Sequence, residues 1–147
     1  MTSTILNSTA TVDLDAARKR NLRTWQESSR LLYAGRIEEF VQYWTPDASY
    51  EAALPVAVIT GRDALRAAFS ALVASATSIT VHDVVFHQTA DPDVAFVEER
   101  MTGVLSDGWR YENRLAIRVQ FSGEQIAYML EYYGQFAHAE LLSHLGF

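Results

Sequence analysis

The chain has 147 residues, of which 49% are hydrophobic and 20% charged, a composition typical of one globular domain and not of a disordered segment. A formal net charge of −6 leaves no basic surface to neutralise phosphates, so we expect neither nucleic acid nor a membrane as a partner. The chain has no cysteine, which excludes disulfides, thiolate catalysis and cysteine-ligated metals.

The first residues, Met1 to Val12, are mostly small and polar, and they predict a flexible tail ahead of a single domain over residues 13–147. They contain neither the basic segment nor the apolar segment of a signal peptide. No apolar run approaches the ~18 residues of a membrane span. A cytoplasmic location is therefore expected.

Helical spacing of apolar residues marks the first part of the chain. Asp13 is a suitable N-cap for a helix that runs to about Ala34, and Gly35 follows as a stop signal. A second helix is expected over residues 37–44, ended by a turn at Thr45-Pro46-Asp47.

A short strand over residues 48–54 and a third helix follow. Thr60 is the expected N-cap of this helix, because its side chain can accept a hydrogen bond from the backbone N–H of Asp63. The apolar stripe of the helix consists of Ala64, Leu65, Ala68, Phe69, Leu72 and Val73.

The hydrophobic period then changes from helical to two, which predicts a meander of antiparallel strands. The strands are expected over residues 79–88, 94–105, 109–121 and 125–133, with a short helix over 136–145. Helices on one side of a curved antiparallel sheet give an α+β layer fold. A strongly curved sheet closed by helices forms a cone whose interior suits a small-molecule pocket.

Four short motifs occur in a characteristic order along these elements. They are Trp44-Thr45-Pro46-Asp47-Ala48, Gly61-Arg62-Asp63-Ala64-Leu65, Tyr111-Glu112-Asn113 and Gln125-Ile126. With the element order they resemble the nuclear transport factor 2-like superfamily, and its SnoaL-like branch in particular, from roughly Asp13 to Gly146. The resemblance implies a cone-shaped curved sheet packed with three N-terminal helices around a pocket.

A second set of segments narrows the resemblance. The segments are Arg18-Lys19-Arg20-Asn21, His82, Thr89-Ala90-Asp91-Pro92-Asp93 ahead of Val97-Glu98, Glu112-Asn113, Glu131-Tyr132 and residues 141–146. In this order they are similar to the phenazine-biosynthesis A/B type. That resemblance implies a dimer with one open pocket per subunit, and acid–base chemistry on a small cyclic substrate without a metal or organic cofactor. It places the pocket glutamate at Glu131.

The chain departs from the phenazine-biosynthesis A/B type in its second helix. On the second helix this chain has Phe40 and Val41 instead of further polar pocket groups, which argues against the same substrate. The superfamily also contains ketosteroid isomerase-like enzymes, epoxide hydrolases, polyketide cyclases and plain binding proteins, so the fold alone does not assign a function.

Turn lengths decide which strand residues face the pocket. A two-residue turn at Asp107-Gly108 would pair Glu98 with Ile117 and Arg100 with Leu115. The pocket face would then carry Phe96, Glu98, Arg100, Thr102, Val104, Tyr111, Asn113, Leu115 and Ile117.

The last turn fixes the face of the final strand. A three-residue turn over residues 122–124 would pair Leu115 with Glu131 and would turn Ala127, Met129 and Tyr133 toward the pocket, whereas a two-residue turn would reverse them. The outward set is too apolar for a solvated strand and predicts a homodimer through the outer sheet face. This set consists of Ile126, Tyr128, Leu130 and Tyr132.

Two glutamates are candidate catalytic residues. In an apolar pocket the pKa of Glu131 would rise toward neutrality, which suits proton transfer. The alternatives are a buried ion pair with Arg100 or an outward-facing side chain. Glu98 could act as a second carboxylate with a divided role, or it could simply be neutralised by Arg100.

Six side chains are candidates for binding substrate: Tyr50, Arg100, Tyr111, Asn113, Tyr133 and His82. The guanidinium group would hold a substrate carboxylate, and the tyrosine hydroxyls would stabilise a developing oxyanion. The Asn113 amide would orient a carbonyl or a water, and the His82 imidazole would act as an acid–base partner at the pocket edge. Each also has a structural interpretation, with its polar atoms satisfied in the core. The spacing of the four histidines favours no metal site.

The sequence therefore predicts a cofactor-independent acid–base enzyme that acts on a small hydrophobic cyclic carbonyl compound. Isomerisation, condensation or cyclisation would each fit, with Glu131 moving a proton next to a carbonyl or imine carbon. One alternative is a non-catalytic small-molecule-binding or scaffold protein of the same fold, and another is an epoxide hydrolase-like activity. A pH dependence above the ordinary glutamate pKa of ~4.3 would favour the enzyme over a binder of neutral ligands.

Overall fold

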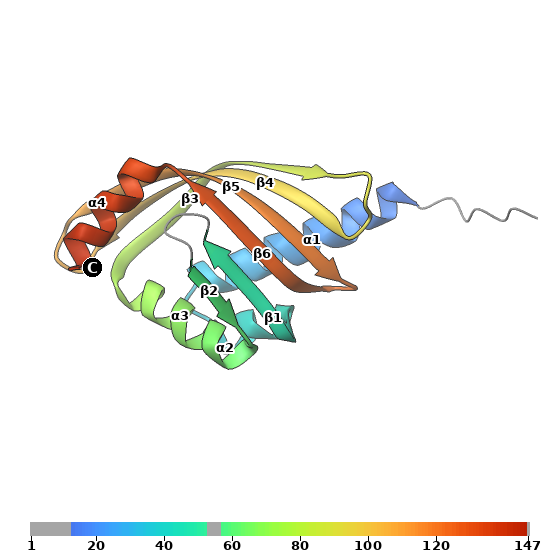
Figure 1. Cartoon of the computed structure of the whole chain (residues 1–147), viewed down its shortest axis with the longest axis horizontal. Helices are drawn as coiled ribbons and strands as arrows, with labels where there is room; N and C mark the ends of the chain where they lie inside the picture. The colour runs from blue at the N-terminus through green and yellow to red at the C-terminus, as the bar shows by residue number, and fades with distance from the viewer. Residues whose placement is uncertain (1–12, 53–56, 147) are drawn as a thin grey trace, which may run out of the picture.

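The computed structural model describes residues 13–52 and 57–146. These residues form a curved, unclosed six-stranded sheet with three helices on one side and a fourth at one end (Figure 1). The predicted α+β class is confirmed, whereas the predicted flexible tail lies outside the described residues. The elements are α1 (Leu14–Tyr33), α2 (Ile37–Phe40), the 3-10 turn η1 (Val41–Tyr43), β1 (Trp44–Ala52), β2 (Ala57–Thr60), α3 (Arg62–Ala74), β3 (Ala76–Gln88), β4 (Val94–Leu105), β5 (Arg110–Ser122), β6 (Gln125–Tyr133) and α4 (Gln135–Leu145).

The first helix begins as predicted, and the third does not. The Asp13 carboxylate accepts a hydrogen bond of 3.0 Å from the backbone N–H of Ala16 and so caps α1. The N-cap of α3 is Gly61, with φ of 92° and no side-chain cap. The prediction that Thr60 caps this helix is wrong, because Thr60 ends β2 and is paired with Ser49.

The predicted turn at residues 45–47 is also wrong, because β1 already begins at Trp44. The pairing of β1 with β6 is irregular between Trp44 and Ser49, and this irregularity accommodates Pro46, which has no N–H to donate to the ladder. The second helix correspondingly ends early, as the single turn α2 followed by η1. The strand β2, which pairs antiparallel with β1, was not predicted from the sequence.

The sheet order is β2-β1-β6-β5-β4-β3. All neighbours are antiparallel except β1 and β6, which are parallel. Strand residues on the side of α1 and α3 form what we call the inner face, and those on the opposite side form the outer face (Figure 1). The hydrophobic core lies between the inner face and these helices.

The turn between β4 and β5 has three residues and not two. The backbone N–H of Leu105 donates to the carbonyl of Trp109 at 2.8 Å, and Val104 lies opposite Arg110. Gly108 supplies a φ of 90° within the turn, a conformation that favours glycine. The register of this hairpin therefore differs by one residue from the prediction.

A shift of one residue turns every side chain of a strand to the other face. Glu99 and Met101 of β4 consequently face inward, opposite Leu115 and Asn113. The predicted inward set of β4, consisting of Phe96, Glu98, Arg100, Thr102 and Val104, lies on the outer face. The prediction for β5 is correct, because its inward residues are Tyr111, Asn113, Leu115 and Ile117.

The final hairpin reaches the predicted face by a different route. Ser122 pairs with Gln125 across a two-residue turn, and a bulge then shifts the register before Tyr128. Glu131 lies opposite Ile117 and not Leu115, a difference of two residues that preserves the face. Ile126 precedes the shift and is 1% exposed in the core, so its predicted outward orientation is wrong.

Candidate active site

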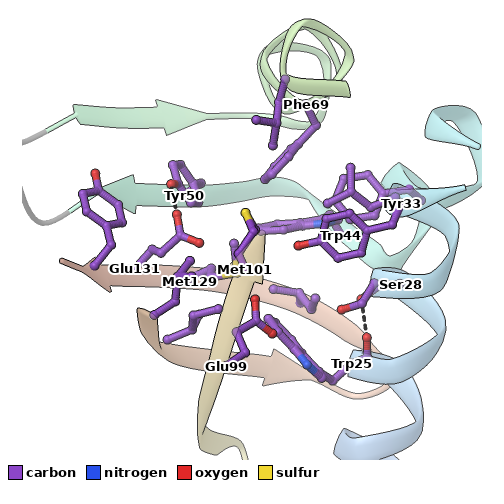
Figure 2. Close-up of a pocket in the computed structure, with 18 of the residues that line it drawn as sticks. Trp25, Ser28, Tyr33, Trp44, Tyr50, Phe69, Glu99, Met101, Met129 and Glu131 are labelled. Carbon is purple, nitrogen blue, oxygen red and sulfur yellow. Dashed lines mark hydrogen bonds between the residues drawn. The ribbon is translucent and has the colours of Figure 1, made fainter. Parts of the chain in front are cut away.

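A cavity of about 170 Å³ lies between the inner face of the sheet and the helices. Aromatic rings from α1, α3 and β1 form much of its wall, as Figure 2 shows for Trp25, Tyr33, Trp44, Tyr50 and Phe69. A dry apolar cavity of about 150 Å³ holds a benzene molecule. The cavity therefore has room for a compact ligand with a single ring.

Ring contacts fix the wall where α3 meets β1. The Phe69 ring lies 5.0 Å from Phe40, 5.9 Å from Trp44 and 5.7 Å from Tyr50, measured between centroids. The contacts with Phe40 and Tyr50 are edge-to-face, a geometry that stabilises aromatic pairs beyond the area that they bury. They hold the Tyr50 ring in the position from which its hydroxyl reaches Glu131.

Glu131 enters the cavity from β6, as predicted. The Tyr50 hydroxyl donates a hydrogen bond to Oε2 of its carboxyl group. Burial raises the pKa of Glu131, and the hydrogen bond from Tyr50 opposes this rise only in part. The alternative of an ion pair with Arg100 is wrong, because Arg100 lies on the outer face.

A second carboxyl group, that of Glu99, enters the same cavity from β4 (Figure 2). Glu99 is 6% exposed and accepts no hydrogen bond from the residues that the structure describes. Desolvation, followed by the charge of Glu131, raises its pKa from 4.5 to about 7. Glu99 was not among the predicted site residues, because a two-residue turn at Asp107-Gly108 would place Glu98 here instead.

Tyrosine hydroxyls surround the two carboxyl groups. Burial raises the pKa of Tyr50 and Tyr111, and burial with the charge of Glu131 raises the pKa of Tyr133 to about 12. The pKa of Tyr33 is raised by burial and then by Glu99 and Glu131. All four are therefore neutral hydrogen-bond donors at physiological pH.

Tyr33 was not among the predicted site residues. Its helical spacing from Trp25 and Ser29, both of which also line the cavity, could have identified it. Residues four apart share one face of a helix, and Tyr33 is the last residue of α1.

His138 closes the cavity from α4. Its ring lies 4.1 Å from the Tyr133 ring, and burial lowers its pKa. His138 is therefore uncharged at neutral pH. It is the only basic residue among the described residues that line the cavity.

Asn113 faces inward, as predicted, but its amide is fully used within the protein. It donates 2.8 Å to the Tyr111 hydroxyl and 3.2 Å to the carbonyl of Gly134, and it accepts 2.8 Å from the Gly134 N–H. These bonds hold the junction of β6 and α4, so Asn113 positions the wall and does not orient substrate. This corrects its predicted role.

Three predicted pocket residues lie on the outer face instead. Glu98 bonds His87 at 2.6 Å, Arg100 pairs with Asp83 at 3.2 Å, and His82 lies opposite Arg100 in the β3–β4 ladder. The one-residue difference in the β4–β5 register is the cause for Glu98 and Arg100. A role in the cavity for Glu98, Arg100 or His82 is therefore contradicted.

Two features are absent within residues 13–52 and 57–146. No group of three or more acidic or histidine side chains there has the arrangement needed to hold a metal ion. In the same residues, no helix combines the length and the apolar character needed to cross a membrane.

Solved structures with the same fold come from several named classes. A phenazine biosynthesis-related protein from Pseudomonas aeruginosa has a TM-score of 0.76 at 18% identity, over 89% of this chain and 90% of that one. A candidate isomerase from Bacillus subtilis has a TM-score of 0.77 at 12% identity, over 86% and 95%. The epoxide hydrolase/cyclase-like enzyme SalBIII, described for pyran ring formation in salinomycin, has a TM-score of 0.73 at 19% identity, over 84% and 96%.

Comparison with curated proteins finds no match. The family model of the SnoaL-like domain matches residues 25–129, a span that runs from Trp25 within α1 to Met129 within β6 and includes Glu99. The matched span is most of the chain, and the neighbouring structures share its fold. The chain therefore belongs to the SnoaL-like domain family.

Proposed function

We propose that the protein is a cofactor-independent acid–base enzyme that acts on a small hydrophobic cyclic carbonyl compound, with Glu99 and Glu131 as the proton-transferring groups. The supporting observation is the presence of two desolvated carboxyl groups in one aromatic cavity. Groups with such perturbed pKa values in a concave site are typical of acid–base catalysis.

The two carboxyl groups have unequal surroundings, which divides their roles. Glu131 accepts a hydrogen bond from Tyr50 that favours its ionised form, so it serves as the base. Glu99, whose pKa is raised to about 7 by burial and by the charge of Glu131, is partly protonated at neutral pH and serves as the acid. Because the charge of Glu131 raises the pKa of Glu99, the two groups titrate as a coupled pair.

The reaction begins when the Glu131 carboxylate removes a proton from the carbon next to the substrate carbonyl. The electron pair of that C–H bond moves to the carbonyl oxygen, where the Glu99 carboxyl group or the Tyr33 hydroxyl donates a hydrogen bond to the enolate. Return of the proton to another carbon gives an isomer. Attack of the enolate carbon on a second carbonyl gives a condensation or a ring.

The same pair of groups supports a second candidate, an epoxide hydrolase-like activity. One carboxyl group would protonate the epoxide oxygen while the other activates a water or an internal hydroxyl. The similarity in fold to SalBIII favours the inclusion of epoxides among the test compounds.

The test is exchange of carbon-bound hydrogen for solvent deuterium, followed by NMR on a panel of small cyclic ketones and enones. We expect Glu99→Gln and Glu131→Gln each to slow exchange by at least about 10²-fold, the usual contribution of a positioned acid or base. Glu98→Gln is the matched control, because its side chain lies on the outer face of the same strand. Wild-type exchange rates in both cavity variants would overturn the proposal, and ligand binding without exchange would favour a binding protein.

A further inference from the structure

We infer that the cavity selects a protonated amine, a compact apolar ring that carries one ammonium group and places it between Glu99 and Glu131. The inference rests on the proposed site, but it concerns the charge of the ligand and not the reaction. It follows from the unpartnered carboxyl oxygens, the lack of a competing cation and the aromatic wall.

Carboxyl oxygens in the cavity lack donors from the protein. The Glu99 side chain is directed into the cavity (Figure 2) and accepts no hydrogen bond or ion pair from the described residues, although the residue is only 6% exposed. Tyr50 occupies only Oε2 of Glu131. The Glu99 carboxyl group is open to the cavity, so a ligand with several N–H groups would satisfy both residues at once.

No basic side chain of the described lining competes for these oxygens. His138 is uncharged at neutral pH because burial lowers its pKa, and Arg100 is held on the outer face by Asp83. An ammonium group would therefore be the only cation at the carboxyl pair. A carboxylate ligand would be repelled by the same pair.

The wall of the cavity suits the same ligand. The rings of Trp25, Tyr33, Trp44 and Phe69 line it, and the faces of aromatic rings attract a desolvated ammonium group. The volume of about 170 Å³ limits the ligand to about one ring with a short substituent. An apolar skeleton would fill the remaining space against these rings.

The titratable groups that face the carboxyl pair come from five elements. Tyr33 on α1, Tyr50 on β1, Tyr111 on β5 and Tyr133 on β6 have raised pKa values and stay neutral. His138 on α4 has a lowered pKa and is neutral at pH 7. Amine binding should therefore weaken below pH 7, as the carboxyl pair gains protons.

The test compares three ligands with the same ring and different charge: benzylamine, benzyl alcohol and benzoate. Calorimetry at pH 8 should give an affinity for benzylamine at least about tenfold above that for benzyl alcohol, with benzoate the weakest. At pH 5 the preference for the amine should be lost. In Glu99→Gln the amine preference should fall about tenfold while benzyl alcohol binds as before, which shows that the cavity is intact, and Glu98→Gln should behave as wild type.

Two results would overturn the inference: benzyl alcohol or benzoate binding as tightly as the amine at pH 8, or an amine preference that survives in both Glu99→Gln and Glu131→Gln. The exchange assay on neutral ketones separates this inference from the proposed function. Hydrogen exchange on a ketone without a preference for the amine would refute only the inferred charge of the ligand. A preference for the amine without hydrogen exchange on any compound would refute only the proposed enzymatic activity.

Discussion

Burial of Glu99 makes the stability of the protein depend on pH. Its pKa is about 7 in the folded chain, against 4.5 for the ordinary glutamate. The folded state therefore binds this proton more tightly than the unfolded state. The contribution to stability is fully present below about pH 4.5 and is lost as the pH rises to about 7. A pKa difference of this size corresponds to about 3 kcal/mol of unfolding free energy.

Glu99→Gln removes the titrating group and keeps the shape of the side chain. We expect the variant to be more stable than wild type by up to about 3 kcal/mol at pH 8, and equally stable near pH 4.5. Urea denaturation over this pH range measures the difference. Glu98→Gln is the matched control, because the Glu98 side chain is 64% exposed and its replacement should leave the profile unchanged. A wild-type pH profile in Glu99→Gln would refute the desolvation argument.

Three further changes test other parts of the structure. Tyr50→Phe removes the hydrogen bond that lowers the pKa of Glu131, so the apparent pKa of the carboxyl pair in an NMR titration should rise; a fall would contradict the assigned contact. Gly134→Ala places a Cβ 2.5 Å from Oδ1 of Asn113 and should destabilise by about 1–3 kcal/mol in urea unfolding, and by less in an Asn113→Ala background. The outer face carries Leu130 and Tyr132, and Tyr132 is 48% exposed. Sedimentation should therefore give a dimer of the 16.5 kDa chain, and Leu130→Arg should dissociate it. A monomeric wild-type protein would contradict this prediction.

The helices and most strands could be predicted because their signals are local. The Asp13 cap is a contact between residues three apart, and the long strands show period-two alternation that depends on one face being buried. The prediction that Thr60 caps α3 was wrong, because no local pattern in the sequence indicates how this residue is paired. Its backbone is held in β2 by pairing with Ser49, so it could not also cap α3.

The choice between Glu98 and Glu99 shows the limit of local reasoning in the site. Ser106-Asp107-Gly108 is compatible with turns of two or three residues, and here the Asp107 carboxylate accepts the Trp109 N–H at 2.9 Å in the longer form. One residue of turn length exchanges an exposed glutamate for a buried one. In the last hairpin the turn is one residue shorter than predicted, and the bulge restores the face that the longer turn would have given. Glu131 therefore faces the cavity as predicted, although it lies opposite a different residue of β5.

The cost of the carboxyl pair bears on the choice between an enzyme and a passive binding protein. Two glutamines in place of Glu99 and Glu131 would fill the same space, and they would avoid the loss of stability that desolvated carboxyl groups impose at neutral pH. A binder of neutral hydrophobic ligands gains nothing from groups that change their protonation near pH 7. Proton transfer requires such groups, and so does selection of a cation. The aromatic cavity by itself is compatible with either class of protein, whereas the unpaired Glu99 beside Glu131 favours a site in which charge changes during use.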